Sequence, residues 1–398
     1  MQLRSCEHLK LADWVKNNPP SVMEELLAGS SKEQWISLAL GLPAAALFPT
    51  HFIEEAFEDV LALNHSVFQY QPPLEELKSH VKHIMALRGV QCHEDQILLT
   101  AGAQQGISLI TRLLLEAQSR VALEKLAYPG LLQALKPFTP DILTINTHMK
   151  TGIDLDEVET AFKRKRPAFL YLVADGGNPH SLTLNDEQRK KLAYLAAEYE
   201  VPIIEDDPYG FLNYQQPRSP IKKYADDWVF YIGSFSKLLA PALRVGWIVA
   251  PQCTMRHLSS LKECSDINTA SFNHHLVNAL LNKNIFESQI QTLRNYYAKQ
   301  RDCLVNSLTQ YLTSDITFSI PECGFFIWAY FLEKINTSRL LQESLKQNVV
   351  FVPSEAFAVT PDSTIYNGMR LNFSYPSEYE IEEGIKRLSL SLQALIKE

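Results

Sequence analysis

The sequence lacks three features that would point to particular classes of protein: a basic charge excess, closely spaced cysteines and a long apolar run. Its 398 residues include 37 Lys and Arg against 45 Asp and Glu, which gives a net charge of −8. This balance provides no global positive field for nucleic acid or an anionic membrane. The six cysteines lie far apart and form no CxxC pair, which argues against a zinc ribbon and a disulfide-rich secreted scaffold.

A segment that could cross a membrane or direct secretion is also missing from the sequence. The most apolar stretch, Trp35–Pro49, is too short to span a bilayer and is interrupted by Gly41, Pro43 and Pro49. A buried strand followed by a turn is expected there. The N-terminal stretch is polar and lacks the apolar core of a signal peptide. We therefore expect a soluble cytoplasmic protein whose partners include neither membrane nor nucleic acid.

Between residues 52 and 249 the sequence alternates regularly between helical and strand-like segments. Apolar residues recur at three- and four-residue spacing in the helical segments, whereas the strands are short apolar runs. Units of this length predict an α/β fold with a mostly parallel sheet that helices cover on both faces. We expect helices at Phe52–Leu63, Leu74–Leu87, Ala103–Ala117, Asp154–Arg164 and Asp186–Tyr199, and strands at Gln96–Ala101, Arg120–Leu123, Ile142–Ile145, Ala168–Val173, Pro202–Glu205, Trp228–Ile232 and Val245–Val249.

After about residue 265 the pattern changes to longer helices and fewer strands. This change predicts a second, smaller α+β unit. Because no low-complexity tract or Pro/Gly/Ser-rich linker separates the two units, we expect them to pack closely. The expected elements are helices at Ile285–Tyr311 and Glu378–Ile396 and strands at Phe325–Tyr330, Val349–Val352 and Arg370–Phe373.

The most informative segment is FYIGSFSKLLAPALRVGWIVAP, which covers residues 230–251. A strand is expected to end at Gly233, and two serines precede Lys237 in a polar turn. Arg244 follows seven residues later, just before the next strand. A lysine held near a second fixed cation has its ammonium form disfavoured, and its neutral amine can form a Schiff base with an aldehyde. A lysine at this position is therefore a candidate nucleophile.

Two further segments place polar groups at the carboxyl ends of strands. IIEDDPYGFL, residues 203–212, carries two adjacent carboxylates after an apolar strand, where open α/β sheets bind ligands. QILLTAGAQQG, residues 96–106, has the strand–glycine–helix order of an anion site, in which backbone N–H groups and the helix dipole face the loop. Taken singly, each segment is also compatible with an ordinary turn. Neither a P-loop nor a GxGxxG fingerprint is present.

Together these three segments resemble the fold type I pyridoxal-phosphate enzymes, specifically the aminoadipate/aromatic branch of the class I/II aminotransferases. The order of elements matches over nearly the whole chain, and the Ser-x-Ser-Lys-x6-Arg-x-Gly pattern is specific. The resemblance implies a large domain at residues 51–299 with a seven-stranded, mostly parallel sheet between helices. It also implies a small α+β domain made of residues 1–50 and 300–398. The implied cofactor is pyridoxal 5′-phosphate.

The resemblance assigns three catalytic residues. Lys237 matches the lysine that forms a Schiff base with the cofactor and then moves the substrate proton. Asp206 matches the carboxylate that keeps the pyridine nitrogen protonated, so that the ring acts as an electron sink. Tyr209 matches the tyrosine that donates a hydrogen bond to the phenolic oxygen of the cofactor.

Other matches imply further contacts with the cofactor. Ser234 and Arg244 fit the serine and arginine that bind the phosphate, and Ala103 and Gln104 fit its backbone cradle. Tyr128, in the AYPG turn, fits the aromatic residue that stacks on the ring.

The remaining matches concern the substrate and a second subunit. Arg370 fits the arginine whose planar fork clamps the substrate carboxylate. Asn178 corresponds to the asparagine that contacts the phenolic oxygen and helps to hold that carboxylate, and Gly41 fits a glycine of a loop over the substrate. Tyr70 fits a tyrosine that reaches the phosphate of a neighbouring subunit, which implies a homodimer.

Three positions depart from the family pattern. Ser181 and Ser354 stand where glycine is usual, and Ala103 replaces a common serine and so removes one possible hydroxyl contact with phosphate. None of these departures removes a catalytic group. They leave open the geometry of the substrate loops, and therefore the specificity.

Three functions follow from these residues. The leading hypothesis is a ping-pong aminotransferase that moves an amino group from an aromatic, aliphatic or aminoadipate-like L-amino acid to a 2-oxo acid. The second is a lyase or related enzyme that uses the same lysine and aspartate, although the carboxylate clamp at Arg370 argues against α-decarboxylation. The third is a cofactor-binding regulator, since this branch also occurs fused to DNA-binding domains. Few residues precede the fold-like region, and no basic recognition helix is visible.

Overall fold

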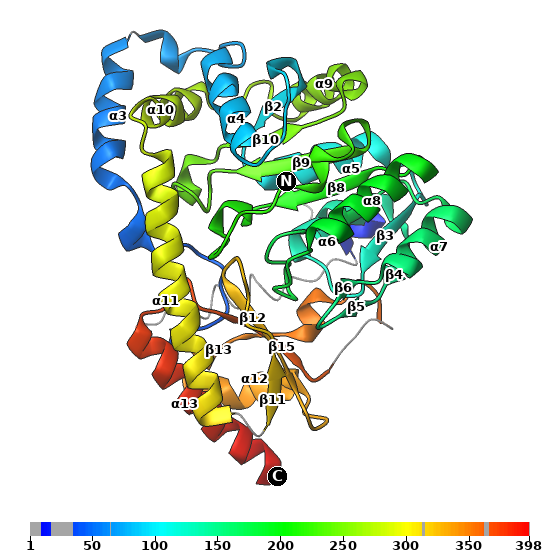
Figure 1. Ribbon diagram of the computed structural model, residues 1–398, viewed down its shortest axis with the longest axis vertical. Coiled ribbons are helices and arrows are strands. Elements are labelled where there is room, and N and C mark those ends of the chain that lie inside the picture. The colour runs from blue at the N-terminus through cyan, green and yellow to red at the C-terminus, as the bar shows by residue number, and fades with distance from the viewer. Residues whose placement is uncertain (1–8, 17–34, 64, 313–314, 362–365, 398) are drawn as a thin grey trace, which may run out of the picture.

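A computed structural model of the chain describes residues 9–16, 35–63, 65–312, 315–361 and 366–397. Two sheets organise these residues, one above the other, and a long helix runs beside both (Figure 1). Within the described residues, no helix is both long and apolar enough to cross a membrane.

The larger sheet has seven strands, in the order β2-β10-β9-β8-β7-β3-β4. Its strands are β2 (Ile97–Thr100), β3 (Arg120–Glu124), β4 (Asp141–Ile145), β7 (Leu170–Leu172), β8 (Ile203–Asp207), β9 (Val229–Ser234) and β10 (Gly246–Val249). Only β10 is antiparallel to its neighbours, β2 and β9. The connection between β9 and β10 is too short for a helical crossover, so the chain must return antiparallel. The predicted α/β class and mostly parallel sheet are confirmed.

Successive residues of the central strands belong to different apolar cores. In β7, Leu170 and Leu172 join one buried cluster, whereas Tyr171 joins the other. Since side chains alternate between the faces of a strand, both faces of the sheet are buried. The helices around this sheet are α3 (Thr50–Leu63), α4 (Glu75–Leu87), α5 (Ala103–Leu114), α6 (Pro129–Leu135), α7 (Leu155–Lys165), α8 (Asp186–Tyr199), α9 (Met255–Asp266) and α10 (Ser271–Asn282).

The smaller sheet lies in the last hundred residues and has the order β11-β12-β15-β14. Its strands are β11 (Ile316–Phe318), β12 (Phe326–Phe331), β14 (Val352–Pro353) and β15 (Gly368–Asn372). Three helices pack around it: α11 (Phe286–Leu312), α12 (Thr337–Lys346) and α13 (Glu378–Lys397). The predicted domain boundary at residue 299 falls inside α11, so this helix belongs in part to both predicted domains.

The segment near residue 36 joins the C-terminal part of the fold. β1 (Ile36–Ser37) pairs in parallel with β13 (Val349–Val350). This pairing agrees with the predicted grouping of residues 1–50 with residues 300–398, which otherwise stays a prediction. Further short elements include α1 (Asp13–Lys16), β5 (Thr147–His148), β6 (Gly152–Ile153) and several 3-10 helices.

The sequence-based prediction of one strand over Val349–Val352 is wrong. The chain forms two strands there, β13 and β14, which pair with β1 and β15 respectively. The partner strand changes at Phe351, so a continuous apolar run does not form a continuous ladder. The pattern also gave no sign of α6, α9, α10 or α12, each of which is held by packing against neighbouring elements.

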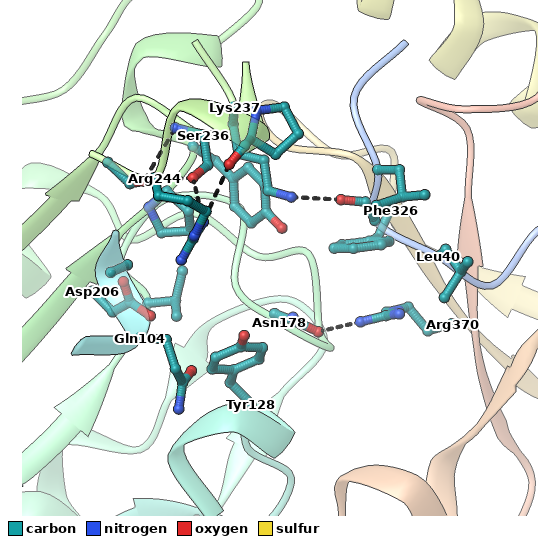
Figure 2. A pocket seen from close by; sticks show the side chains of 18 residues that line it. Leu40, Gln104, Tyr128, Asn178, Asp206, Ser236, Lys237, Arg244, Phe326 and Arg370 are labelled. Atoms are coloured by element: carbon teal, nitrogen blue, oxygen red, sulfur yellow. Dashed lines mark hydrogen bonds between the residues drawn. The ribbon is translucent and has the colours of Figure 1, made fainter. Parts of the chain in front are cut away.

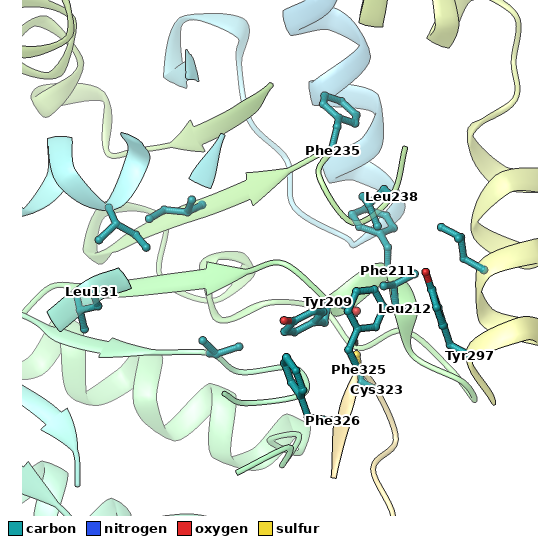
Figure 3. Packing of buried hydrophobic residues seen from close by; sticks show 14 of the residues in the cluster. Leu131, Tyr209, Phe211, Leu212, Phe235, Leu238, Tyr297, Cys323, Phe325 and Phe326 are labelled. Carbon is teal, nitrogen blue, oxygen red and sulfur yellow. Dashed lines mark hydrogen bonds between the residues drawn. The ribbon is translucent and has the colours of Figure 1, made fainter. Parts of the chain in front are cut away.

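Aromatic packing joins the loop after β8 to the start of β12 (Figure 3). The Phe325 ring lies 5.3 Å from that of Tyr209 and 4.6 Å from that of Tyr297, measured between ring centroids. The Cys323 thiol donates to the Tyr209 carbonyl at 2.8 Å. The smaller sheet therefore fixes the position of Tyr209, which lies beside the carboxyl end of β8.

Candidate active site

A pocket of about 330 Å³ opens at the carboxyl ends of the parallel strands (Figure 2). This edge of an open α/β sheet is where ligands bind. The structure brings the following predicted residues together as its lining: Gly41, Ala103, Gln104, Tyr128, Asn178, Asp206, Tyr209, Ser234, Lys237, Arg244 and Arg370. Tyr70 lies outside this pocket on the surface, with 73% of its area exposed.

Asp206 brings a buried carboxylate to the pocket from the end of β8. Tyr171 donates its hydroxyl hydrogen to Asp206 Oδ2 at 2.7 Å. Oδ1 is buried and finds no hydrogen-bond partner among the described residues. The pKa of Asp206 is raised to about 7, because burial and the charge of Asp207 together outweigh the opposing hydrogen bond from Tyr171. A donor inside the pocket would therefore satisfy Oδ1 and favour the ionised form.

The second carboxylate of the predicted pair, Asp207, serves the core instead. Its Oδ2 accepts from Arg88 Nη1 at 2.9 Å and from the Tyr231 hydroxyl at 2.8 Å. Arg88 also donates to Asp175, which in turn accepts from Arg189. Adjacent residues of a strand point to opposite faces, so only one member of an Asp–Asp pair can enter the pocket. No motif in the sequence indicated this buried ion network.

Lys237 lies in the connection between β9 and β10. Its Nζ donates to the Gly41 carbonyl at 2.7 Å, from the loop that follows β1 (Figure 2). Burial, together with the nearby charges of Arg370 and Arg244, lowers the pKa of Lys237 to about 8. About a tenth of the amine is therefore neutral at pH 7, and the direction of the shift is the one expected for a lysine beside fixed cations.

Arg244 holds the loop between β2 and α5. It has a left-handed backbone, with φ 50°, and its Nη2 donates to the Ala101 carbonyl at 2.9 Å. A Cβ at Gly102 would lie 2.6 Å from that Nη2, and Gly102 also has φ 83°. Glycine is therefore required at this position for two reasons. Because glycine has no side chain that could cap α5, the first N–H groups of the helix are available to an anion.

Arg370 occupies the opposite side of the pocket, on β15 (Figure 2). Nη1 donates to Asn178 Oδ1 at 2.8 Å, and Nη2 donates to the Ala39 carbonyl at 2.7 Å. Its guanidinium carbon lies 3.9 Å from the centre of the Phe326 ring and 4.9 Å from that of Phe357. Burial lowers the pKa of Arg370 to about 10, so the group stays cationic at neutral pH. In the described part of the chain, its buried Nε has no acceptor.

Two tyrosines and a glutamine complete the polar lining. Burial raises the pKa of both Tyr128 and Tyr209, so each phenol remains a hydrogen-bond donor at neutral pH. Gln104 donates to the Gly130 carbonyl at 2.7 Å. A Cβ at Gly130 would lie 2.4 Å from both Gln104 Oε1 and the Tyr128 ring, which explains glycine after proline in the AYPG turn.

The sequence analysis missed several lining residues, most of them apolar. They are Leu40, Leu42, Val173, Pro208, Ser236, Pro241 and Phe326. Ser236 could have been found, because it lies next to Lys237 in the matched motif. Phe326 could not, since it reaches the pocket only through packing with a distant loop: a Cβ at Gly41 would lie 2.5 Å from its Cζ.

Comparison with known proteins identifies the family of the chain that forms this pocket. The family model for aminotransferase class I and II matches residues 33–388. The chain belongs to this family. It is a pyridoxal-phosphate-dependent aminotransferase of fold type I, and the predictions of fold, reaction and cofactor are confirmed.

Alignments with named aminotransferases span almost the whole chain. Aromatic-amino-acid aminotransferase 1 of Thermococcus litoralis is 32% identical over 95% of this chain and 92% of its own length. The 2-aminoadipate transaminase of Thermus thermophilus is 30% identical over 94% of each chain. The crystal structure of a kynurenine aminotransferase from Pyrococcus horikoshii, in complex with PMP, superimposes with a TM-score of 0.92 at 30% identity, covering 98% of both chains.

The two serines that replace family glycines differ in backbone conformation. Ser181 has φ 59°, a left-handed conformation that favours glycine. Ser354 is fully buried, and its Oγ lacks a hydrogen-bond partner within the described residues. It does not share the left-handed backbone of Ser181.

Replacing Ser181 with glycine is therefore expected to stabilise the aminotransferase by about 0.5–1 kcal/mol, because the left-handed conformation costs glycine little. Chemical denaturation of the two proteins measures the difference. Ser354→Gly is the matched control, since it makes the same substitution without relieving a left-handed residue. A gain in stability from Ser354→Gly that equals the gain from Ser181→Gly would contradict the explanation.

We expect the pKa of Lys237 to set the pH dependence of the rate at which the cofactor binds covalently. With a pKa of about 8, its amine is protonated below that pH and nucleophilic above it. The rate at which the cofactor-free aminotransferase bonds to pyridoxal 5′-phosphate should rise through about pH 8 and then level off. Stopped-flow absorbance between pH 6.5 and 9.5 measures this rate.

The variant Arg370→Met supplies the control for that titration. It removes one of the charges that lower the pKa of Lys237, so the midpoint should move to higher pH. A midpoint near 10 in the unchanged protein would contradict the assigned environment of Lys237.

Proposed function

We propose that this aminotransferase transfers the amino group of an L-amino acid with an aromatic or aliphatic side chain to a 2-oxo acid. The observation that carries the proposal is a pair of unsatisfied buried groups in one pocket. Asp206 Oδ1 lacks a donor and Arg370 Nε lacks an acceptor among the described residues, while the Lys237 amine lines the same pocket. A protonated ring nitrogen and a carboxylate would satisfy these two groups.

The phosphate of the cofactor fits the side of the pocket that Arg244 lines. The N–H groups of Ala103 and Gln104 open α5 there, and the helix dipole favours an anion. The Ser234 hydroxyl lies in the same wall and accepts from Ser236 N at 3.1 Å. We assign these residues to the phosphate.

The ring of the cofactor is assigned to the side chains between the two arginines. Asp206 would pair with the ring nitrogen and keep it protonated. Tyr209 and Asn178 would contact the phenolic oxygen, and Tyr128 would stack on the ring. All four line the pocket, and Asp206 and Tyr209 are each 4% exposed, so water is largely excluded from these contacts.

When bound, pyridoxal 5′-phosphate supplies an aldehyde that bonds to amines and a protonated ring that withdraws electrons from the substrate α-carbon. Lys237 would hold the aldehyde and would be released when the amino group of the substrate takes its place. Its free Nζ, with a pKa lowered to about 8, would then accept the proton from the substrate α-carbon and donate it to the cofactor carbon that carried the aldehyde. The same lysine reverses this transfer with the incoming 2-oxo acid, which gives ping-pong kinetics.

The substrate carboxylate is assigned to Arg370. The rings of Phe326 and Phe357 and the bonds to Asn178 and Ala39 fix the plane of its guanidinium. A fixed fork loses little entropy when it binds a carboxylate with two hydrogen bonds. Gly41, in the loop that reaches Lys237, would close over the substrate.

The expected class of substrate side chain follows from the cations of the pocket that are not assigned to the phosphate or to the substrate carboxylate. Arg244 and Arg370 are assigned to phosphate and carboxylate, and the pocket lining drawn from the described residues contains no further cation besides Lys237. A second carboxylate on the substrate would therefore be unpaired. The apolar lining residues Leu40, Leu42, Val173 and Phe326 suit an aromatic or aliphatic side chain instead.

We also propose that the enzyme is a homodimer, as Tyr70 implied. Large apolar side chains that precede this residue in the sequence are exposed: Phe57, Leu61 and Phe68 by 44%, 48% and 64%. Rings of Phe57 and Phe68 pack on Phe272 of α10. Patches of this kind mark protein interfaces. Arg244 is also exposed in the single chain, so Tyr70 of a second copy could reach the cofactor phosphate assigned to Arg244.

A cytoplasmic location remains part of the proposal. The described cysteines, Cys92, Cys253, Cys264, Cys303 and Cys323, are free thiols. Disulfides are common in secreted proteins and rare in the cytosol, so free thiols favour the cytosol.

A half-reaction screen tests the proposed substrates. L-amino acids are added singly to the cofactor-loaded enzyme, and conversion of the cofactor to pyridoxamine phosphate is followed by absorbance. Leucine, phenylalanine and tyrosine should convert the cofactor faster than aspartate. The first three lack a second carboxylate and can use the apolar lining.

Two results would contradict the proposal. Faster conversion by aspartate would mean that the pocket contains a second carboxylate site. Release of pyruvate and ammonia without conversion of the cofactor would favour a lyase. Sedimentation of the loaded enzyme tests the dimer, and Phe68→Glu should shift it to the monomer.

A further inference from the structure

We propose that Gln105 and Asp266 are positioning residues for the phosphate-binding loop, although neither lines the pocket. Gln105 bonds directly to the loop formed by Ala101 and Gly102, and Asp266 bonds to Gln105. This inference rests on the proposed role of that loop in binding phosphate.

The amide of Gln105 links the loop to Asp266, the last residue of α9. Its Oε1 accepts from the Ala101 N–H at 2.8 Å, and its Nε2 donates to Asp266 Oδ2 at 2.9 Å. Only one orientation of the amide satisfies both partners, because a backbone N–H can only donate and a carboxylate can only accept. The backbone of Ala101 is therefore held at its N–H and at its carbonyl, since Arg244 donates to the carbonyl.

Asp266 is itself fixed by three donors. Its carboxylate accepts from Lys262 Nζ at 3.0 Å and from Thr269 Oγ1 at 2.9 Å, in addition to Gln105. Partial burial raises the pKa of Asp266, but the bonds from Gln105, Lys262 and Thr269 outweigh it and lower the pKa overall. Asp266 is thus a fixed anion that orients the Gln105 amide.

The backbone is strained at Ile267, directly after Asp266, where a tight turn brings Thr269 back to Asp266. Ile267 has φ 56° and ψ −58° and is 70% exposed, which is unfavourable for a β-branched residue. The Asn268 N–H donates to the Asp266 carbonyl, which makes Ile267 the centre of the rare form of γ-turn. This tight turn returns the Thr269 hydroxyl to Asp266. Such strain persists where the surroundings require the conformation.

The consequence is a loop whose N–H groups are oriented before the phosphate arrives. An anion site gains affinity when its donors need no reorganisation on binding. Loss of the Gln105 amide would release the N–H of Ala101 while leaving Arg244, Lys237 and Asp206 in place. Phosphate affinity should therefore fall without a change in proton transfer at Lys237.

The chain offers a matched control at the other end of β2. Gln96 accepts from the His93 N–H at 2.9 Å and donates to Asp226 Oδ2 at 2.9 Å. This is the same bridge from a backbone N–H to an aspartate, but it precedes the strand rather than following it. Gln105→Met and Gln96→Met therefore remove equivalent bonds, and only Gln105→Met touches the loop.

The test measures binding of inorganic phosphate and of pyridoxal 5′-phosphate to the full chain stripped of cofactor, by calorimetry, together with thermal unfolding. Gln105→Met should weaken both ligands about 10-fold, whereas Gln96→Met should leave both within twofold of the unchanged protein. Asp266→Asn, which keeps an acceptor for Gln105 but removes the charge, should weaken both ligands to a smaller extent. It serves as the second variant if Gln105→Met fails to fold.

Arg244→Gln separates failure of this inference from failure of the site. If Arg244→Gln weakens phosphate binding but folded Gln105→Met and Asp266→Asn do not, the positioning role is wrong. The same conclusion holds if Gln96→Met weakens binding as much as Gln105→Met does. If Arg244→Gln has no effect either, the phosphate site itself has been misplaced and the inference falls with it.

Discussion

Replacing Lys237 with alanine is expected to lower the rate of transamination by at least about 10⁴-fold. The substitution removes both the group that bonds to the cofactor aldehyde and the base that moves the α-proton, and proton transfer by a positioned side chain alone contributes about 10²–10⁴-fold. Single-turnover kinetics with the best amino acid from the screen measure the loss. The variant should still bind pyridoxal 5′-phosphate, because the proposed phosphate contacts of Arg244 remain.

Two controls accompany this variant. Lys237→Arg keeps a cation at the position but cannot form the bond, so it should lose as much activity as Lys237→Ala. Lys191→Ala removes a lysine of a surface ion pair with Glu159 and should have no effect. Borohydride reduction of the loaded enzyme should attach the cofactor to Lys237; attachment to any other lysine would refute the assignment.

Replacing Asp206 with asparagine is expected to lower kcat/KM by about 10²–10³-fold. Asparagine can still accept from Tyr171 but provides no negative charge for a protonated ring nitrogen, and losing one partner of a buried ion pair costs about 3–5 kcal/mol. Steady-state kinetics measure the change. Absorbance of the bound cofactor as a function of pH should show the ring nitrogen deprotonating at lower pH than in the unchanged enzyme.

In the cofactor-free protein, the same substitution should not lower stability, although it lowers activity in the loaded enzyme. Because burial raises the pKa of Asp206 from 3.8 to about 7, its contribution to stability is fully present below pH 3.8 and is lost as the pH rises through 7. This loss amounts to roughly 4 kcal/mol in the absence of a ligand. Asp206→Asn should therefore be at least as stable as the unchanged cofactor-free protein at pH 8, although it is nearly inactive.

The neighbouring carboxylate supplies the matched control. Asp207→Asn leaves the buried Arg88 with one carboxylate partner fewer and should lower the free energy of unfolding by about 3–5 kcal/mol. The molecules that remain folded should keep most of their activity. If Asp207→Asn abolished catalysis while Asp206→Asn spared it, the two carboxylates would have exchanged roles.

Much of the fold could be predicted because its elements carry local signals. α8 begins with a capping box between Asn185 and Gln188, and its observed bounds are the predicted ones. The buried strands of the larger sheet are short apolar runs, as parallel strands must be. By contrast, α9 and α10 were missed, and neither has a side-chain cap at its start. β13 and β14 were merged because pairing partners are not encoded in a local pattern.

The candidate site was predicted to the extent that its residues belong to contiguous motifs. Lys237, Arg244 and Ser234 lie in one segment, and the resemblance of that segment to a family motif implied a shared site. Phe326 and Gln105 act through contacts with distant segments, and the sequence gives no sign of either role. Phe326 packs against Gly41 and Arg370, and Gln105 bonds to Asp266.

The sequence by itself indicated the fold class from its alternating pattern, and its resemblance to a known family implied the reaction and the cofactor. Tertiary structure decided that Asp207, the neighbour of Asp206, pairs with Arg88 in the core. It also decided that Arg370 is fixed between two rings and that the pKa of Lys237 falls to about 8. Each of these outcomes depends on side-chain direction, burial or contacts between segments far apart in the chain. Such properties arise only when the chain has folded.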